Sequence, residues 1–329
     1  MISAVEPLRI GCLGAARIAP SALIKPTKDI PGVEAYAVAA RNPARAKDFA
    51  AKHGIPVVHD SYDALIADDR IDAVYNPLPN GLHAVWTIKA LAAGKHVLCE
   101  KPFTANEEEA RRVAAAVPDS LVVMEAFHWR YHPLAARVLE IIASGELGEI
   151  RHIEAALCFP LPRFKDIRWQ LDLAGGSLMD AGCYPVSMVR TFAGAEPTVT
   201  HAVAKEHSPG VDRYMQADFA FADGRTGRIT ASMWSARLLD VRAKVVGSSG
   251  SLKVFNPTSP HMYHRLSVGG RHEKVNGRPT YTHQLEAFRA AVREGAPTLT
   301  PPAWSIANMA VIDAIYRAAG LPLRPGQLT

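Results

Sequence analysis

The sequence predicts two domains of different fold class. Residues 1–126 are expected to form an α/β domain with a parallel sheet, and residues 127–329 an α+β domain with a large, mostly antiparallel open sheet. The length of 329 residues fits two domains at about 150 residues each. In the first part, short apolar runs alternate with helical patterns, which is typical of βαβ units with right-handed crossovers. In the second part, longer β-type runs follow one another, separated by glycine-containing turns.

The first domain is expected to alternate strand and helix along its length. Pro43 favours a helix start, because the N–H that proline lacks has no partner there. Asn106 is a typical N-cap, and the three glutamates after it suit the positive end of a helix dipole. The expected strands are 8–13, 34–40, 72–76, 96–99 and 121–124, and the expected helices are 42–52, 82–93 and 106–117.

The second domain is expected to hold most of the antiparallel strands. Asp223-Gly224 is a hairpin signal between two of them. The last helix is expected to be able to pack back on the first domain. The expected strands are 150–159, 198–204, 215–221, 227–234, 241–246 and 251–255, and the expected helices are 133–143, 184–192, 283–293 and 305–318.

Composition excludes several classes of protein. With 48% hydrophobic and 21% charged residues, the chain is neither disordered nor fibrous. No apolar run approaches the ~18 residues of a membrane span, and the first 13 residues lack the features of a signal peptide, so a cytoplasmic protein is expected. The net charge of +5 divides into −1 for residues 1–126 and +6 for residues 127–329, without a basic block, so nucleic acid is not an expected partner. The cysteines at 12, 99, 158 and 183 lack metal-binding spacing and are expected to be reduced.

The turn after the first strand is the first candidate site. It reads Gly14-x-Ala16-x-x-Ala19, a dinucleotide-binding fingerprint of the Rossmann type with alanines at the second and third glycine positions. The pyrophosphate would lie on the N-terminus of the following helix. An ordinary strand–turn–helix junction is the alternative. The candidate cofactor-binding residues of this segment are Gly11, Gly14, Ala15, Ala16, Arg17 and Ile18.

The end of the second strand predicts which dinucleotide is bound. An NAD site commonly has an acidic residue there for the ribose hydroxyls. This chain has Arg41 instead, with Arg45 four residues later. Two guanidinium groups suit a 2′-phosphate, so NADP is the expected cofactor and NAD the less favoured one. Two surface arginines at a helix start are the alternative interpretation.

Lys101 of the Glu100-Lys101-Pro102 segment directly follows a strand. Ligands of open parallel sheets bind at the carboxyl ends of strands, where a desolvated lysine with a lowered pKa can hydrogen-bond a substrate hydroxyl or relay its proton. The Lys-Pro bond is a candidate cis peptide. A solvated strand-end lysine is the alternative.

A glycine-rich segment from Gly175 to Pro185 carries the other candidates. Asp180 and Tyr184 are four residues apart, which places both on one helical face. A tyrosine hydroxyl can act in acid–base chemistry if a nearby cation lowers its pKa. Gly175 and Gly176 would allow a ligand to approach the backbone closely. The alternative is a turn into a core helix, with Tyr184 simply buried.

Taken together, these segments resemble the glucose–fructose oxidoreductase / inositol dehydrogenase (Gfo/Idh/MocA) family. The resemblance rests on five motifs in order: Gly14-x-Ala16 with Arg17-Ile18-Ala19-Pro20, Pro79-Asn80-x-x-His83, Glu100-Lys101-Pro102, the 125–133 segment EAFHWRYHP, and GGSLMDAGCYPVS from residue 175. It spans nearly the whole chain. Within the family, the sequence is most similar to the dimeric dihydrodiol dehydrogenase and NADP-dependent D-xylose dehydrogenase branch.

The resemblance implies an enzyme with a Rossmann domain and a second domain whose open sheet forms a homo-oligomer, commonly a dimer. It implies that Lys101 is catalytic, that Tyr184 is the acid–base group, and that Asp180 orients the substrate or tunes that pair. Trp129 and Arg130 would line the pocket between the domains, with Arg168 as a further substrate contact. Around the nicotinamide half of the cofactor it implies Leu78, Asn80, His83 and Glu100.

The substrate is left open between two classes. Aldoses and cyclic or aromatic dihydrodiols both present vicinal hydroxyls, and Trp129 could stack on a flat face of either. A D-xylose 1-dehydrogenase-like activity on a sugar is the first expectation, and trans-1,2-dihydrodiol dehydrogenase activity is the second. A non-catalytic NADP-binding sensor is the alternative from a different class. Metal ligands are not predicted.

Overall fold

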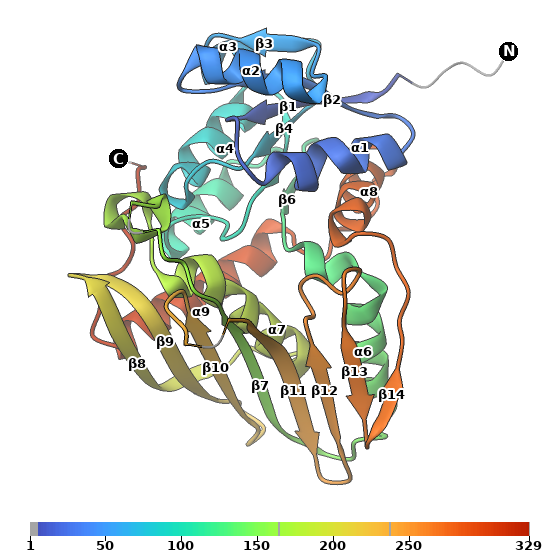
Figure 1. Ribbon diagram of the computed structural model, residues 1–329, viewed down its shortest axis with the longest axis vertical. Helices are drawn as coiled ribbons and strands as arrows, with labels where there is room; N and C mark the ends of the chain where they lie inside the picture. The colour runs from blue at the N-terminus through green and yellow to red at the C-terminus, as the bar shows by residue number, and fades with distance from the viewer. Residues whose placement is uncertain (1–5, 164, 237, 329) are drawn as a thin grey trace, which may run out of the picture.

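A computed structural model describes residues 6–163, 165–236 and 238–328. Figure 1 shows that it contains two separate sheets. The first five residues of the segment expected to lack a signal peptide lie outside the described residues. A parallel sheet occupies one end of the molecule and a larger, mostly antiparallel sheet the other, so the predicted fold class is confirmed. No described helix is both long and apolar enough to cross a membrane.

The N-terminal sheet is parallel and has the strand order β3-β2-β1-β4-β5-β6. The chain adds strands on one side of β1 and then returns to its other side with β4, which makes the carboxyl ends of β1 and β4 the switch point of the sheet. The strands are β1 (Leu8–Leu13), β2 (Val33–Ala39), β3 (Val57–His59), β4 (Ala73–Asn76), β5 (His96–Cys99) and β6 (Val123–Glu125).

The helices of this domain begin where the sequence places caps. The Asn42 side chain accepts from the backbone N–H groups of Ala44 and Arg45, and the Asn106 side chain accepts from Glu109. The short elements η1, α1, β3 and α3 were not predicted, because five residues or fewer carry little periodic signal. The helices are η1 (Pro20–Ile24), α1 (Lys25–Asp29), α2 (Pro43–His53), α3 (Tyr62–Ile66), η2 (Asn80–Leu82), α4 (His83–Ala92) and α5 (Glu107–Ala115).

The second sheet has the order β14-β13-β12-β11-β7-β10-β9-β8. All its described neighbours are antiparallel except β7 and β10, which run parallel with Ile153 opposite Gly227. The expected strands are confirmed, whereas β13 and β14 were not predicted. The strands are β7 (Ile150–Cys158), β8 (Thr198–Ser208), β9 (Val211–Ala220), β10 (Thr226–Ser232), β11 (Asp240–Gly247), β12 (Ser251–Phe255), β13 (Arg265–Val268) and β14 (Arg271–Glu273).

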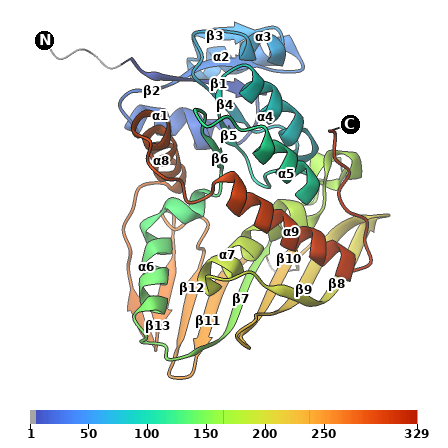
Figure 2. The ribbon, with the colours of Figure 1, turned by 180° about the vertical axis from the view of Figure 1, so that it is seen from behind.

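Helices cover one face of this sheet, as Figure 2 shows for α6, α7 and α9. The α9 helix also contacts α5 of the first domain, and the Asp313 carboxylate accepts a hydrogen bond from the backbone N–H of Glu107 at 3.0 Å. The helices of this part are η3 (His128–Tyr131), α6 (Pro133–Ala143), η4 (Ile167–Trp169), η5 (Leu171–Leu173), the π-helical turn η6 (Leu178–Gly182), α7 (Cys183–Ala193), α8 (Thr280–Glu294) and α9 (Pro302–Ala318).

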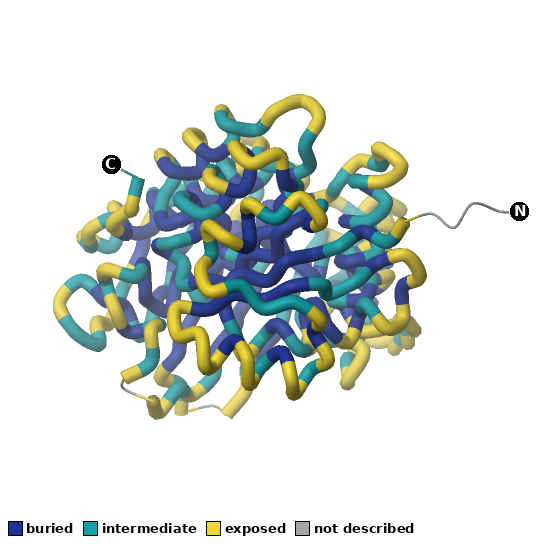
Figure 3. The backbone as a smooth tube through the Cα atoms, turned by 90° about the horizontal axis from the view of Figure 1, so that it is seen from above, coloured by how far each residue is buried: buried dark blue, intermediate teal, exposed yellow. Residues whose placement is uncertain are grey.

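The hydrophobic core lies around the strands that have helices packed on both of their faces. Leu8, Ile10 and Leu13 of β1 are fully buried, as expected for a central parallel strand with helices on both sides. Figure 3, which views the molecule from above, shows buried segments in the middle with exposed segments around them. A rigid central sheet fixes the positions of the turns that follow β1, β4 and β5, and those turns form the candidate site.

Candidate active site

A cavity of about 520 Å³ opens at the carboxyl ends of β1 and β4, between the two domains. The turns after these strands supply one wall, and η4 and η6 of the second domain supply the opposite wall. This is the position at which an open parallel sheet binds ligands. The lining residues are Ala15–Ile18, Arg45, Pro77–Asn80, His83, Glu100, Lys101, Lys165–Arg168, Leu173, Asp180, Tyr184 and Tyr281.

The turn after β1 forms one side of the cavity. Gly14 has φ of +99°, which an L side chain rarely adopts, and its N–H donates to the Ala39 carbonyl at 2.6 Å. The Arg45 guanidinium reaches across to this turn, with Nη2 3.4 Å from the Ala15 carbonyl oxygen. Arg17 lines the same side, so cationic groups face the opening here.

Gly11 differs from its sequence-based prediction, and Arg41 lies beside the cavity rather than in its lining. Gly11 lies inside β1, where a Cβ would be 2.6 Å from Cδ2 of Leu65, so its small size serves packing against α3 rather than approach to a ligand. Arg41 is exposed two residues after β2, and neither Arg41 nor the buried Gly14 is among the residues that line the cavity. The cavity therefore places Arg45, and not Arg41, directly beside the turn.

Lys101, which follows β5 of the first domain, meets Asp180 of η6 in the cavity. The Lys101-Pro102 peptide is cis. The Lys101 ammonium donates to the backbone carbonyl of Asp180 at 2.9 Å, and its Nζ lies 3.8 Å from Asp180 Oδ1. The Arg168 Nε lies 2.8 Å from Asp180 Oδ2. Asp180 thus bridges two cations and holds them at one edge of the cavity.

The Tyr184 ring lies beside Lys101. Their separation is 4.9 Å from Nζ to the ring centroid, a cation–π distance. Asp180 is in η6 and Tyr184 is in the first turn of α7, so the four-residue spacing places both on the cavity wall as predicted. The Tyr184 side chain is otherwise buried, with 7% of its surface exposed.

The two pKa expectations were wrong. Burial by itself lowers the pKa of Lys101, but the negative charges of its neighbours, Asp180 first and then Glu100, outweigh it, so the pKa is raised above its ordinary value. Burial raises the pKa of Tyr184 well above its ordinary value. Burial also raises the pKa of Cys183 to about 12, which leaves an unreactive thiol.

Hydrogen bonds connect the segment after β4 to the segment after β5. Both ring nitrogens of His83 lie 2.7 Å from carbonyl oxygens, those of Pro102 and Leu78. Glu100 is buried and accepts a hydrogen bond from the Tyr75 hydroxyl at 2.8 Å. These contacts fix the turn that carries Lys101.

Asn80 joins this segment to the second domain. Its side-chain amide donates to the Ala174 carbonyl at 3.1 Å, and a Cβ on the next residue, Gly81, would lie 3.3 Å from the Leu173 carbonyl carbon. The two domains therefore meet backbone to backbone beside the cavity.

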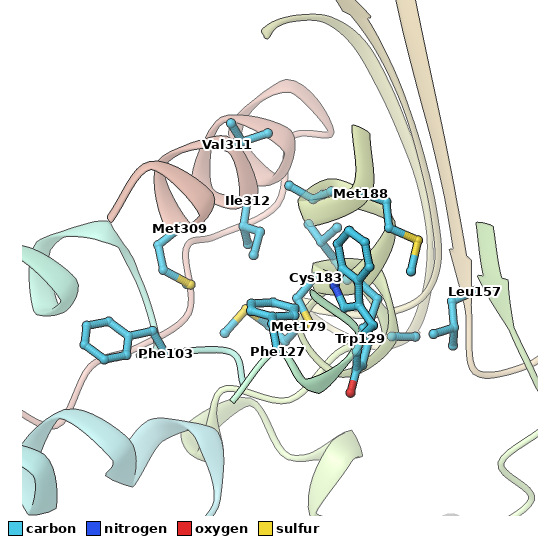
Figure 4. Close-up of a cluster of buried hydrophobic side chains, with 14 of the residues drawn as sticks. Phe103, Phe127, Trp129, Leu157, Met179, Cys183, Met188, Met309, Val311 and Ile312 are labelled. Atoms are coloured by element: carbon cyan, nitrogen blue, oxygen red, sulfur yellow. The ribbon is translucent and has the colours of Figure 1, made fainter. Parts of the chain in front are cut away.

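Trp129 and Arg130 do not lie where the resemblance implied. Trp129 is 1% exposed, and its indole N–H donates to Ser187 Oγ at 3.1 Å. Figure 4 shows it in the buried cluster behind the site, together with Phe127 and Met188. Arg130 donates to Thr191 Oγ1 at 3.1 Å. The η3 turn directs both side chains onto α7 and away from the cavity. For Trp129, a large indole is stabilised more by core burial than by partial exposure.

Gly175 and Gly176 pack against protein rather than a ligand. A Cβ on Gly175 would lie 2.6 Å from the Arg168 carbonyl oxygen, and one on Gly176 would lie 2.2 Å from Asp212 Oδ1. The buried Asp212 carboxylate accepts from Ser177 Oγ at 2.8 Å and from the Leu178 N–H at 2.7 Å. The glycines thus let the chain turn tightly into η6 and aim Asp180 at Lys101.

Sequence reasoning missed several cavity residues and one neighbour of Tyr184. Lys165, Asp166 and Ile167 come from an irregular segment with no periodic signal, and Tyr281 lies 97 residues beyond Tyr184 in the chain. His128 contacts the Tyr184 hydroxyl, and only its place in the EAFHWRYHP segment pointed to it. No group of three or more metal-ligating side chains occurs in the described parts of the chain.

A parallel sheet with a cavity at its switch point and a lysine and a tyrosine on one wall defines a class, the oxidoreductases with a dinucleotide-binding Rossmann fold. Two family models agree: the oxidoreductase family, NAD-binding Rossmann fold, matches residues 8–127, and the GFO/IDH/MocA C-terminal domain matches residues 135–253. The chain belongs to the GFO/IDH/MocA oxidoreductase family.

Individual relatives support the same assignment. The chain is 39% identical to D-xylose 1-dehydrogenase (NADP(+)) 2 of Haloferax volcanii, over 95% of this chain and 97% of that protein. It is 33% identical to trans-1,2-dihydrobenzene-1,2-diol dehydrogenase of Sus scrofa, over 68% of this chain and 67% of that one. Its structure resembles KijD10, a 3-ketoreductase from Actinomadura kijaniata in complex with NADP and TDP-benzene, with a TM-score of 0.89, 30% identity and coverage of 95% and 98% of the two chains.

Proposed function

We propose that this protein is an NADP-dependent dehydrogenase that oxidises a carbinol carbon of a sugar or a cyclic diol. A D-xylose 1-dehydrogenase-like reaction is our first assignment and a trans-1,2-dihydrodiol dehydrogenase reaction the second. The observation that carries the proposal is the convergence of Lys101, Asp180 and Tyr184 in the cavity that the turn after β1 also lines. Relatives named for both activities support it.

The residues of the nucleotide side fit NADP. The turn 14–18 presents backbone at a sheet switch point, and Arg45 adds a cation to it. Arg41 follows β2 where an NAD site commonly has an acid, so a 2′-phosphate meets positive charge from two arginines of the β2–α2 turn. When bound, the nicotinamide accepts the hydride that leaves the carbinol carbon. Leu78, Asn80, His83 and Glu100 are our proposed neighbours of that half of the cofactor.

We assign the substrate hydroxyl proton to Tyr184, whose phenolate form takes that proton and becomes the neutral phenol. The ammonium of Lys101, held by Asp180, stabilises the negative charge that develops on the oxygens during the transfer. Arg168 lies close enough to this pair to contact a second substrate hydroxyl. The cavity walls exclude water from most of Tyr184, which strengthens these interactions.

The proposal also includes the domain boundary, the oligomeric state and the cellular compartment. We propose a domain boundary at residue 126, directly after β6. We propose a homodimer through the sheet face that no described helix covers, which size-exclusion chromatography with light scattering would test. Four buried cysteines without a disulfide support a reducing compartment, as in the cytoplasm.

Binding and turnover test the proposal together. We expect NADP+ to raise the melting temperature more than NAD+, and NADPH to form with an aldose or a dihydrodiol in a screen of both classes. Arg45→Ala is expected to weaken NADP+ binding about tenfold to a hundredfold, since a charged hydrogen bond is worth about 1.5–3 kcal/mol, and to leave NAD+ binding unchanged. Arg111→Ala, an exposed arginine on α5, is the control.

Two variants separate catalysis from binding. Lys101→Met and Tyr184→Phe are each expected to lower kcat by at least about a hundredfold while NADP+ still binds. If no polyol gives NADPH although NADP+ binds, the protein is a sensor rather than an enzyme. If Tyr184→Phe keeps the wild-type kcat, the proton belongs to another group.

A further inference from the structure

The hydroxyl of Tyr184 contacts a histidine that has a second hydroxyl on its other side. His128 Nε2 lies 2.9 Å from the Tyr184 oxygen, and His128 Nδ1 lies 2.9 Å from Thr280 Oγ1. The three residues come from α7, η3 and α8, so distant parts of the chain build one line of hydrogen bonds. This line starts at the cavity, because Tyr184 is among its lining residues.

The imidazole is enclosed and cannot turn freely. His128 is 4% exposed and Thr280 is fully buried. The Tyr281 ring lies over the imidazole with centroids 4.2 Å apart, and the Tyr184 ring meets it edge-on at 5.7 Å. Each ring nitrogen is therefore held at hydrogen-bond distance from one hydroxyl.

The charge state of His128 follows from its surroundings. Burial, and after it the positive charge of Lys101 and the neighbouring His261, lower the pKa of His128 to about 3. At neutral pH the ring thus carries one N–H and one lone pair. Whichever nitrogen holds the proton, the other accepts, because hydroxyl groups can serve either way.

We propose that His128 is a positioning residue that sets the direction of the Tyr184 O–H bond. With the proton on Nδ1, the ring accepts a hydrogen bond from the Tyr184 hydroxyl. The lone pairs of the tyrosine oxygen are then free to accept a hydrogen bond from a substrate hydroxyl. With the proton on Nε2, the ring donates to Tyr184, whose own proton is then free to be donated to a carbonyl. The Nδ1-protonated tautomer thus prepares the site for oxidation and the Nε2-protonated tautomer for reduction. The Thr280 hydroxyl accepts a hydrogen bond from Nδ1 in the first tautomer and donates one to Nδ1 in the second. This inference rests on the proposed role of Tyr184.

The decisive test is a double-mutant cycle. His128→Phe keeps the ring and removes both hydrogen bonds, and is expected to lower kcat about tenfold to a hundredfold with NADP+ binding changed less than about twofold. In a Tyr184→Phe background, the same substitution is expected to cost nothing further, because His128 acts only through that hydroxyl. A further loss of kcat in that background would overturn the proposal.

Thr280 and a neighbouring histidine provide the controls. Thr280→Val is expected to lower kcat and Thr280→Ser to restore it, since serine keeps the hydroxyl. His132→Asn alters a buried histidine four residues away that caps α6 through the Leu134 N–H, and its kcat is expected to stay at the wild-type value. A full kcat in His128→Phe, or equal losses in Thr280→Val and Thr280→Ser, would refute the inference.

A measurement without turnover separates this inference from the proposed function. In ¹⁵N-histidine-labelled protein, long-range ¹H–¹⁵N spectra report the tautomer of each ring, and the signals of His128 are those lost in His128→Phe. Both Tyr184→Phe and Thr280→Val are expected to shift these signals. If they do not shift, the hydrogen-bonded line is absent and the inference fails, whether or not NADPH forms.

Discussion

Removing the charge of Asp180 while keeping its shape tests how the site holds Lys101. Asp180→Asn leaves the backbone carbonyl that accepts from the ammonium at 2.9 Å, so Lys101 stays in place. What disappears is the carboxylate whose Oδ1 lies 3.8 Å from Nζ. The variant therefore changes the electrostatics of Lys101 with little change of geometry.

The size of the effect follows from that distance. Both side chains are 14% exposed, so an effective dielectric constant of about 20 applies, and two unit charges at this separation attract by about 4 kcal/mol. Losing this attraction moves the ammonium–amine equilibrium of Lys101 toward the amine. The pKa of Lys101 falls, because burial is then opposed by fewer negative charges.

The assay is the pH dependence of kcat/KM for NADP+ reduction. If the Lys101 ammonium is the active form, activity is lost as pH rises through its pKa, and in Asp180→Asn this loss moves to lower pH. Arg168→Gln is the matched control, because it removes a cation from the same carboxylate and is expected to move the loss the other way. If kcat/KM falls at the same high pH in both variants and in the wild type, the reasoning is refuted.

Three further substitutions test the packing around the site. Trp129→Phe is expected to lower the free energy of unfolding by about 2 kcal/mol, through a smaller core side chain and the lost bond to Ser187, with kcat/KM unchanged; a kinetic loss at full stability in urea titrations would place Trp129 at the substrate. Burial raises the pKa of Glu125 to about 8 from 4.5, so the folded state keeps a proton that the unfolded chain releases, and stability falls as pH rises between these values. Glu125→Gln should flatten this slope in urea unfolding between pH 5 and pH 8; an unchanged slope would contradict it. Gly176→Ala, with its Cβ 2.2 Å from Asp212 and φ of +132°, is expected to cost about 2–4 kcal/mol and to lower kcat, whereas wild-type melting would show that the turn relaxes.

Elements with a strong local signal were predicted well. The strand 8–13 and the helices starting at Pro43 and after Asn106 follow from apolar runs and caps, which act within a few residues. The short β3, α3, β13 and β14 were missed, since their strand and helix states depend on neighbours supplied by the rest of the fold. The same limit applied to side-chain direction: EAFHWRYHP marks an important turn, but not which of its rings faces the cavity.

The pKa expectations failed for a related reason. A desolvated lysine at a strand end was expected to have a lowered pKa, but the direction of the shift depends on which acids lie beside it. Asp180 is 79 residues from Lys101 in the chain and 3.8 Å away in space. Burial and pairing have opposite signs, and only the distances decide between them.

By itself, the sequence determined the fold class and the motifs that carry Lys101, Asp180 and Tyr184, because periodicity, caps and strand-end position are local properties. The tertiary structure alone decided that Trp129 belongs to the core, that the glycines before η6 pack on protein, and that His128 contacts the Tyr184 hydroxyl. These outcomes depend on packing between segments far apart in the chain, and the energies that decide them exist only once those segments are in contact.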